Sequence, residues 1–167
     1  MPSQPAETGT ASRPPVFHVV LHEPEIPNNT GNIGRTCVAT GCSLHLIHPL
    51  GFDTSEKACR RAGLDYWPEV KLVRHRKLDS LYESLPEARF IYLTTKADRI
   101  YTDCEFQPHD CLVFGRETRG LPEDLLRANW ENCLRIPILN PNIRSLNLAT
   151  AAGIVLFEAL RQTGQFQ

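Results

Sequence analysis

The chain has 167 residues and a formal net charge of −1, and 41% of its residues are hydrophobic. This size and composition predict one ordinary globular domain, and they exclude a protein that binds nucleic acid through its overall charge. No apolar run approaches the roughly 20 residues that a membrane-spanning helix needs, so no membrane association is expected. Residues 1–15 combine Pro, Ser, Thr and Ala without a hydrophobic centre, which predicts a disordered tail before a single domain over residues 16–167.

Six cysteines occur without a C-x-x-C pair, mostly within or beside apolar runs. This pattern predicts buried, reduced thiols in a cytoplasmic protein. His45 and His48 are three residues apart, but they lie around a short predicted strand that ends at Pro49. Because these spacings do not supply clustered ligands, no metal site is expected.

Apolar runs alternate with helical patterns from residue 16 to the end of the chain. Strands are predicted at residues 16–21, 44–47, 70–73, 90–93, 111–114 and 133–136. Helices are predicted over residues 30–40, 56–62, 78–85, 121–128 and 145–162. This alternation predicts an α/β fold of three layers with a mostly parallel sheet. Ligands of such folds bind beyond the carboxyl ends of the strands, so the candidate site is formed by the loops after residues 21, 93, 114 and 136.

Local signals mark where the predicted helices begin and end. Gly41 and Gly63 are predicted stops, and Ser55 and Ser145 are predicted N-caps. The small residues 151–153 (Ala-Ala-Gly) predict close packing of the last helix against other backbone. Residues 96–110 are polar and rich in turn formers, so they are predicted to be mostly loop.

The first candidate loop, residues 28–35, reads Asn-Asn-Thr-Gly-Asn-Ile-Gly-Arg and leads from a strand into a helix. A helix start offers unpaired N–H groups and the positive end of a dipole to an anion. Gly31 and Gly34 give G-x-x-G, however, and not the G-x-G-x-x-G of a dinucleotide-binding loop. What remains is Arg35, held one turn inside a helix start. The alternative is a capped helix start with Arg35 solvated on the surface.

The second candidate loop, residues 115–122, follows a continuous apolar strand and contains two glycines. Glycine permits positive φ angles and lets a ligand approach the backbone closely. Glu117 places a carboxylate at the mouth of a cleft, where it accepts hydrogen bonds or orients a cation. The alternative is a tight turn in which Glu117 pairs with Arg116 or Arg119.

The third candidate loop, residues 136–147, carries an apolar strand into two Asn-Pro type turns and then a helix start. Main-chain groups that turns leave free are suited to pair with the edge of an adenine. The alternative for Asn147 is an exposed residue in the first helical turn.

Basic residues are densest at Lys57, Arg60 and Arg61 and in residues 74–77 (Arg-His-Arg-Lys). Tyr66 and Trp67 lie between these two runs. Such a mixture is suited to hold phosphates and to stack a base. The alternative is a solvated charged face.

Together, the three loops resemble the motifs of the SPOUT superfamily of RNA methyltransferases. Residues 28–35 are similar to its motif 1, residues 114–122 to its motif 2 and residues 136–149 to its motif 3. Residues 23–27, 60–66 and 93–96 are similar to the compact TrmL type, which methylates the ribose of the tRNA wobble nucleotide. The chain departs from this type at Arg116, where relatives often carry Pro, and in its fifteen-residue tail.

The resemblance implies a deep trefoil knot near the C-terminus, bound S-adenosylmethionine, and a homodimer with active sites at its interface. It implies cofactor contacts by Leu93, Gly115, Ile136, Ser145 and Leu146. It further implies that the residues at the reaction centre are Arg35, Asn29, Glu117 and Asn147. The candidate contacts with tRNA, for which the anticodon stem-loop is the expected region, are Arg60, Arg61, Tyr66 and Arg144.

The reaction implied is transfer of the sulfonium methyl group to the 2′-oxygen of a wobble cytidine or modified uridine, without a metal. A guanidinium stays protonated near neutral pH, so Arg35 is a poor general base. We therefore expect Arg35 to fix a neighbouring phosphate and to stabilise the developing alkoxide. The alternatives are 2′-O-methylation of another tRNA or rRNA position, and a non-catalytic RNA-binding module that uses the same loops.

Overall fold

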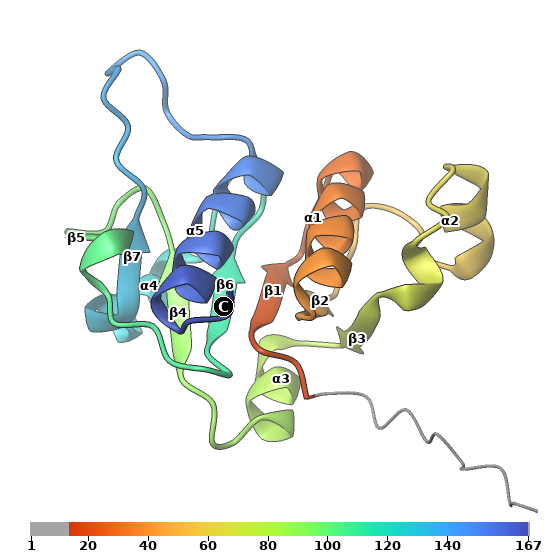
Figure 1. Cartoon of the computed structure of the whole chain (residues 1–167). Coiled ribbons are helices and arrows are strands. Elements are labelled where there is room, and N and C mark those ends of the chain that lie inside the picture. The colour runs from red at the N-terminus through yellow and green to blue at the C-terminus, as the bar shows by residue number, and fades with distance from the viewer. Residues whose placement is uncertain (1–13, 167) are drawn as a thin grey trace, which may run out of the picture.

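The structure, a computed structural model, describes residues 14–166 (Figure 1). The predicted disordered tail lies outside the described residues, apart from its last two positions. Within the described residues, seven strands form one sheet in the order β3-β2-β1-β6-β4-β7-β5, and every neighbouring pair is parallel. The strands are β1 (His18–His22), β2 (Ser43–Ile47), β3 (Lys71–His75), β4 (Phe90–Leu93), β5 (Arg99–Ile100), β6 (Cys111–Phe114) and β7 (Cys133–Arg135).

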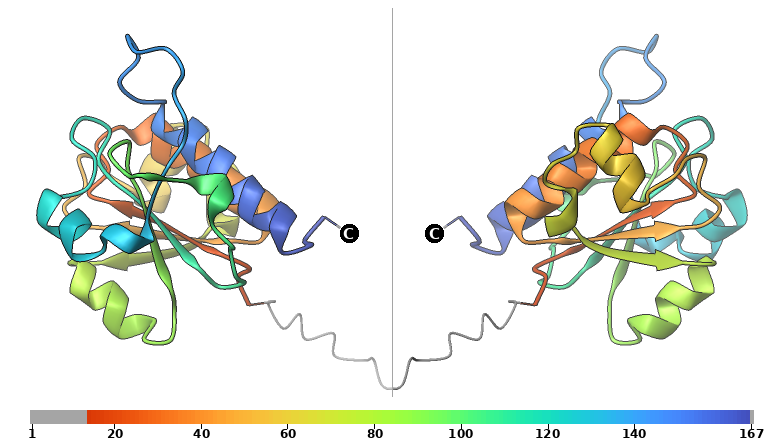
Figure 2. Two further views of the ribbon diagram at one scale, coloured as in Figure 1. Left: turned by 90° about the vertical axis from the view of Figure 1, so that its left-hand side faces the viewer. Right: turned by 90° about the vertical axis from the view of Figure 1, so that its right-hand side faces the viewer.

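Helices cover both faces of the sheet and give the three layers that the sequence predicts (Figure 2). On one face, α1 and α5 contact each other, and α2 and η1 lie beside α1. The helices α3 and α4 lie on the other face. The helices are α1 (Pro27–Thr40), α2 (Glu56–Arg61), η1 (Trp67–Glu69), α3 (Leu78–Ser84), η2 (Tyr101–Asp103), α4 (Glu123–Ala128), η3 (Trp130–Asn132) and α5 (Leu148–Gln162).

The central strand β6 is buried along its whole length, as expected of a strand that is covered on both faces. Its Leu112 and Phe114 join the core that includes residues of α1 and α5, whereas Cys111 and Val113 join the core that includes residues of α3 and α4. The six cysteines are free and buried, which confirms their predicted burial. Burial raises the pKa of Cys111 to about 12, so this thiol stays protonated.

The predicted elements agree with the observed ones in type and order, and their boundaries differ by up to three residues. Residues 96–110 are mostly loop, as predicted, but they contain the two-residue edge strand β5 and the short helix η2. Gly41 ends α1 as predicted, and it does so in the left-handed conformation. Ser55 caps α2 as predicted, since its side chain accepts a hydrogen bond from the N–H of Ala58.

One prediction about α5 is wrong, and a second one holds only in part. Asn147 and not Ser145 is its N-cap, because the helix begins at Leu148 and Asn147 Oδ1 accepts the N–H of Thr150 at 3.2 Å. Close packing holds for Ala152, which is 3% exposed, but not for Gly153, where an added Cβ would meet no atom within 4 Å. One residue turns a helix by about 100°, so the neighbour of a core position can face outward.

A buried row of histidines crosses the sheet from β1 to β3. His18 Nδ1 lies 2.9 Å from His45 Nε2, and His45 Nδ1 lies 3.0 Å from His75 Nε2. Ser43 Oγ lies within 3.0 Å of both His18 Nδ1 and His45 Nε2. Burial lowers the pKa of all three histidines, and it lowers that of His45 to about 3 with the help of His18 and His75. The folded protein therefore holds this row neutral near pH 7.

Candidate functional site

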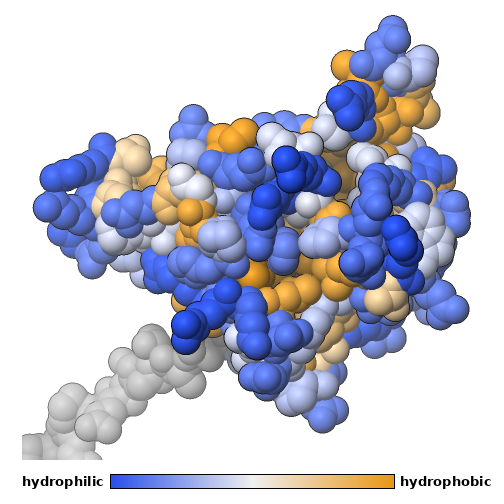
Figure 3. Space-filling view, turned by 180° about the vertical axis from the view of Figure 1, so that it is seen from behind, coloured by the Kyte–Doolittle hydropathy of each residue, from blue (hydrophilic) through white to orange (hydrophobic). Residues whose placement is uncertain are grey.

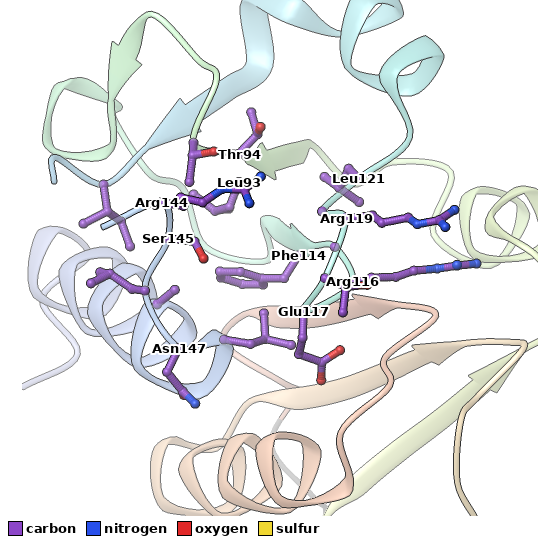
Figure 4. A pocket seen from close by; sticks show the side chains of 18 of the residues that line it. Leu93, Thr94, Phe114, Arg116, Glu117, Arg119, Leu121, Arg144, Ser145 and Asn147 are labelled. Carbon is purple, nitrogen blue, oxygen red and sulfur yellow. The ribbon is translucent and has the colours of Figure 1, made fainter. Parts of the chain in front are cut away.

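A pocket of about 770 Å³ lies at the carboxyl ends of β4, β6 and β7 (Figure 4). This is the edge of the sheet at which open parallel α/β folds bind ligands. Its walls come from the loops after β1, β4, β6 and β7, which are the four loops that the sequence predicts. The volume lies within the range of about 300–1,000 Å³ that is typical of small-molecule and cofactor sites.

The residues predicted to contact a cofactor all line this pocket, and they are Leu93, Gly115, Ile136, Ser145 and Leu146. The sequence prediction missed Phe114, Thr94 and Leu121, which also line it (Figure 4). Phe114 ends β6 and Thr94 follows β4 directly. The rule that ligands bind at the carboxyl ends of strands was therefore a sufficient signal for both of them.

Gly115 permits a tight return of the chain at the pocket wall. The N–H of Gly120 donates to the carbonyl of Arg116 at 2.9 Å, and the N–H of Arg116 donates to the carbonyl of Gly120 at 3.3 Å. A Cβ on Gly115 would lie 2.2 Å from the carbonyl carbon of Gly120, and Gly120 itself has a φ of 67°. Backbone crowding at one position and a left-handed conformation at the other therefore both require glycine.

Glu117 reaches from this turn to the start of α1. Its Oε2 accepts the N–H of Glu25 at 2.8 Å, and its Oε1 accepts the N–H of Ile26 at 3.0 Å. The same Oε1 accepts a longer bond from Asn29 Nδ2, at 3.4 Å. The carboxylate thus satisfies backbone donors at a helix N-terminus, where a negative charge is favourable. It does not take the alternative role of an ion pair with an arginine of its own turn.

Asn29 connects Glu117 to the last helix. Asn29 is 6% exposed, and its Oδ1 accepts a hydrogen bond from Asn147 Nδ2 at 3.0 Å. Since Asn147 also caps α5, one chain of hydrogen bonds joins a turn after β6 to the starts of α1 and α5. Figure 4 shows Glu117 and Asn147 on the same side of the pocket. The structure therefore brings together three of the four residues predicted for the reaction centre.

The arginines of the turn after β6 have different environments. Arg116 forms an ion pair with Glu23, which fastens the turn to the loop after β1. The turn therefore closes with an arginine at position 116, where the family pattern often has proline. The side chain of Arg119 has no hydrogen bond or ion pair among the described residues, and Figure 4 shows it extending to the same side as that of Arg116. Arg144, a predicted RNA contact, lines the pocket from the loop before α5.

Arg35 does not line the pocket with the other predicted residues. Its side chain is exposed, and its guanidinium carbon lies 5.7 Å from the centroid of the Tyr66 ring. Tyr66 in turn donates its hydroxyl to the carbonyl of Gly31 at 2.7 Å. The predicted residues Arg35 and Tyr66 thus lie together on the side of α1 that faces η1.

The two other candidate RNA contacts lie on α2. Arg60 forms an exposed ion pair with Glu56, one helical turn earlier. Arg61 is exposed and has no partner among the described residues. Exposed pairs contribute little to stability, so this basic helix is free to serve an external ligand.

The loop between β7 and α5 stands away from the body of the molecule (Figures 1 and 3). Leu139 is 94% exposed and Ile143 is 48% exposed on this loop. Figure 3 shows apolar residues on the protruding loop. Both side chains are therefore available to contact another molecule.

Between residues 14 and 166, no three His, Cys, Asp or Glu side chains are arranged to hold a metal ion. In the same part of the chain, no helix combines the length and apolar character needed to cross a membrane.

The sheet, the pocket at its carboxyl edge and the polar chain at the pocket rim define an open parallel α/β protein with a ligand site of cofactor size. The chain belongs to the SpoU rRNA Methylase family, which matches residues 16–157.

Three similar proteins refine this assignment. The tRNA (cytidine(34)-2′-O)-methyltransferase of Saccharophagus degradans is 48% identical over 150 residues, which cover 89% of this chain and 97% of that protein. A solved structure concerned with the 2-OH methylation of C/U34 on tRNA is 46% identical, with a TM-score of 0.81, and the match covers 87% of this chain and 95% of that one. The AdoMet-bound rRNA methyltransferase of Sinorhizobium meliloti is 26% identical, with a TM-score of 0.73, and the match covers 87% of this chain and 56% of that one.

Proposed function

We propose that this protein transfers a methyl group from S-adenosylmethionine to the ribose 2′-oxygen of nucleotide 34 of tRNA, a cytidine or uridine. The observation that carries the proposal is the chain Glu117–Asn29–Asn147 at the rim of a cofactor-sized pocket. The relatives support the choice of substrate, because proteins of nearly the same length are named for position 34. Within this proposal the chain from residue 16 onward is one SPOUT methyltransferase domain, with a C-terminal trefoil knot, in the cytoplasm.

The pocket fits S-adenosylmethionine in size and in the chemistry of its lining. Phe114, Leu134 and Ile136 offer apolar surface, while Ser145 and the loop backbone offer polar groups. The proposed cofactor contacts are Leu93, Gly115, Ile136, Ser145 and Leu146. When it is bound, the cofactor supplies a methyl group on a positively charged sulfur, an electrophile that needs no metal to activate it.

The position of Arg35 supports a role in the pocket of a second subunit. Arg35 follows Asn29 by six residues, so it points about 120° away around α1 and lies about 9 Å further along the helix. Asn29 lines the pocket of its own chain, and Arg35 does not. In the partner's site, Arg35 holds a phosphate beside the target ribose and stabilises the alkoxide that forms there. Its guanidinium keeps its charge, so a phosphate oxygen is the better proton acceptor.

The outer face of α5 supports a homodimer as the assembly that brings Arg35 to a second pocket. Phe157 is 46% exposed and Phe166 is 59% exposed, and their ring centroids lie 5.8 Å apart. Gly153, on the same helix, leaves the backbone open to close approach. Ile26, at the start of the adjacent α1, is 44% exposed. A second copy seated on α1 and α5 covers these apolar residues and completes both sites.

The test is to incubate the purified protein with tritiated S-adenosylmethionine and tRNA from cells that lack this modification. The expected product is an alkali-resistant 2′-O-methyl nucleotide that maps to position 34. Methylation at another tRNA position or in rRNA would keep the enzyme and change the substrate. Cofactor and RNA binding without incorporation would replace the proposal by a non-catalytic RNA-binding module.

A further inference from the structure

The turn after β6 forms a large part of the pocket wall, since residues 114–121 line the pocket without a gap. We call residues 115–121 the pocket turn. The backbone pair of Arg116 and Gly120 closes its base. Among the described residues, no hydrogen bond to another main-chain group holds residues 117–119, which form its tip. The position of the tip therefore depends on side chains.

Thr118, in the middle of the tip, is held by the side chain of Glu25. The Thr118 hydroxyl donates to Glu25 Oε1 at 2.7 Å, and the Thr118 N–H donates to the same oxygen at 3.3 Å. Thr118 makes no other hydrogen bond among the described residues. It is exposed, so packing in the core does not fix it. The carboxylate of Glu25 is therefore the tether of the tip.

Glu25 lies outside the pocket that it helps to shape. It belongs to the loop between β1 and α1, is half-buried and lines no part of the pocket wall. Its effect on a bound ligand therefore passes through the turn. Its other oxygen, Oε2, has no hydrogen bond among the described residues. A direct effect of the negative charge on a substrate is thus the alternative that an experiment must separate.

The loop and the turn hold each other through carboxylates from both sides. Glu117 of the turn accepts the N–H groups of Glu25 and Ile26, while Glu25 accepts both donors of Thr118. Arg116 adds its ion pair with Glu23. Three successive residues of the pocket turn are thus bonded to residues 23–26, across 91–93 positions of sequence.

The loop between β1 and α1 is a firm support, because it is also fixed on its far side. The N–H of Glu23 donates to the carbonyl of Ile47 at 2.9 Å, and the N–H of Gly51 donates to the carbonyl of Pro24 at 3.2 Å. A Cβ on Gly51 would lie 3.1 Å from the carbonyl oxygen of Glu25, so the two loops pack closely. A tether on a fixed loop restricts the tip more than a tether on a mobile one.

We propose that Glu25 is a positioning residue for the cofactor: by holding Thr118, it keeps the pocket turn in the shape that binds S-adenosylmethionine before the cofactor arrives. This inference rests on the proposed function for the identity of the ligand. A turn that adopts the binding shape for only a fraction of the time lowers the apparent affinity by that fraction. Saturating cofactor restores the shape. Loss of the tether therefore acts on cofactor affinity and leaves kcat nearly unchanged.

The first test measures the Kd of S-adenosylmethionine by calorimetry, without RNA. Glu25→Ala should raise this Kd about tenfold, which is the effect of losing one hydrogen bond to a charged group. In a methylation assay, the same variant should raise the KM for the cofactor to a similar extent and keep kcat close to that of the wild type. Glu87→Ala, which removes an exposed carboxylate without a partner among the described residues, should change none of these constants.

Two substitutions of Glu25 separate the reach of the side chain from its charge. Glu25→Gln keeps the length and an acceptor oxygen but removes the charge. Glu25→Asp keeps the charge but is one carbon shorter. We expect Glu25→Gln to retain most of the affinity that Glu25→Ala loses, and Glu25→Asp to retain little of it. The opposite order, or a fall of kcat at saturating cofactor in Glu25→Ala, would assign the effect to the charge and overturn the proposal.

Thr118→Val tests the other end of the tether without disturbing the core. It keeps the side-chain shape at an exposed position, so it should leave the melting temperature unchanged and still raise the Kd of S-adenosylmethionine. The double variant E25A/T118V should bind no more weakly than Glu25→Ala, because both changes remove the same contact. Additive effects on the Kd, or wild-type affinity in Thr118→Val, would contradict the tether.

Hydrogen exchange at the Thr118 amide measures the tether without any ligand. Glu25→Ala should make this exchange faster, and added S-adenosylmethionine should slow it again. An exchange rate that Glu25→Ala leaves at the wild-type value would count against the proposal. Wild-type protein that binds S-adenosylmethionine but does not methylate tRNA would count against the proposed function and not against this role of Glu25.

Discussion

Asn29 and Asn147 are 118 residues apart in sequence, and a hydrogen bond of 3.0 Å joins their side chains at the rim of the pocket. This bond joins the first turn of α1 to the N-cap residue of α5. The same Asn147 caps α5, so its structural and functional roles can be separated by substitution.

Asn147→Ala should remove the cap and destabilise the protein by about 1 kcal/mol. Asn147→Asp should keep the cap, since a carboxylate accepts the N–H of Thr150, but it places an acceptor against the acceptor Oδ1 of Asn29. We therefore expect a capped α5, a loss of about 1–3 kcal/mol of stability because the buried Oδ1 of Asn29 is left without its donor, and a strong loss of kcat for Asn147→Asp. Urea unfolding and single-turnover methylation measure the two effects. Equal kinetics for wild type and Asn147→Asp would show that the Asn29 contact does not matter to the reaction.

Glu117→Gln should loosen the start of α1. The carboxylate accepts two backbone N–H groups there, and an amide presents its NH2 group to one of them. Each hydrogen bond to a charged acceptor contributes about 1.5–3 kcal/mol. We therefore expect the free energy of unfolding to fall by up to this amount and the activity to fall as well. Hydrogen exchange at the amides of Glu25 and Ile26 should become faster. Glu123→Gln, an exposed carboxylate of α4, is the matched control and should change neither exchange nor activity.

Gly115→Ala should abolish cofactor binding. The new Cβ would overlap the backbone of Gly120, and neither chain segment can yield without opening the turn that lines the pocket. Overpacking of this kind costs about 1–3 kcal/mol. Gly31→Ala is the control for the chemical change, because this glycine of α1 lies outside the pocket lining, its added Cβ would make an ordinary contact of 3.4 Å with Leu64, and helix propensity favours alanine by about 0.5–1 kcal/mol. Calorimetry with S-adenosylmethionine distinguishes the two variants.

Arg35→Ala and Asn147→Asp chains should complement each other if Arg35 serves the partner's pocket. Co-expression should give mixed dimers in which one site has an intact pocket and an intact Arg35. Random pairing makes half of the dimers mixed, with one good site of two, so about a quarter of the wild-type activity should return. Each variant alone should be nearly inactive. Activity no higher than the mean of the two single variants would place Arg35 in its own subunit's site.

The protein should lose stability as the pH falls from about 6.5 towards 5. Burial lowers the pKa of His18, His45 and His75 in the folded state, whereas the unfolded chain binds protons with ordinary histidine pKa values. The unfolded state thus takes up more protons in this range. Each such histidine therefore lowers the free energy of unfolding by up to about 1.4 kcal/mol for every unit by which the pH falls. Unfolding in urea at several pH values measures the slope. His48→Gln, at an exposed position, should leave the slope unchanged, and a flat profile between pH 6.5 and 5 would contradict the assignment.

The fold class could be predicted from the sequence, because apolar runs and helix signals are formed by residues that are close together in sequence. The strand β6 shows this best, since a continuous apolar run predicts a strand covered on both faces. The pairing of β1 with β6 was not predictable in the same way, because it depends on contacts between residues about ninety positions apart. The edge strand β5 was missed because two residues carry no periodicity.

For the site, glycine and loop composition were enough to identify the pocket walls. The partner of Glu117 was not predictable, because an arginine next to it in sequence was the simpler expectation and backbone N–H groups leave no mark on a sequence. The cap of α5 was misplaced because Ser145 and Asn147 are both good N-caps, and only the observed start of the helix decides between them. The separation of Arg35 from the pocket depends on the direction of α1 in space, which no motif encodes.

The bond between Asn29 and Asn147 also has a consequence for biosynthesis. A ribosome makes Asn29 118 residues before Asn147, so a growing chain has the first half of the pocket rim well before the second. Until α5 is made, Asn29 lacks its partner, and the face of α1 that α5 covers is open to water. Residues 144–148 and 151 also line the pocket, so a nascent chain has no complete pocket until this segment has left the ribosome.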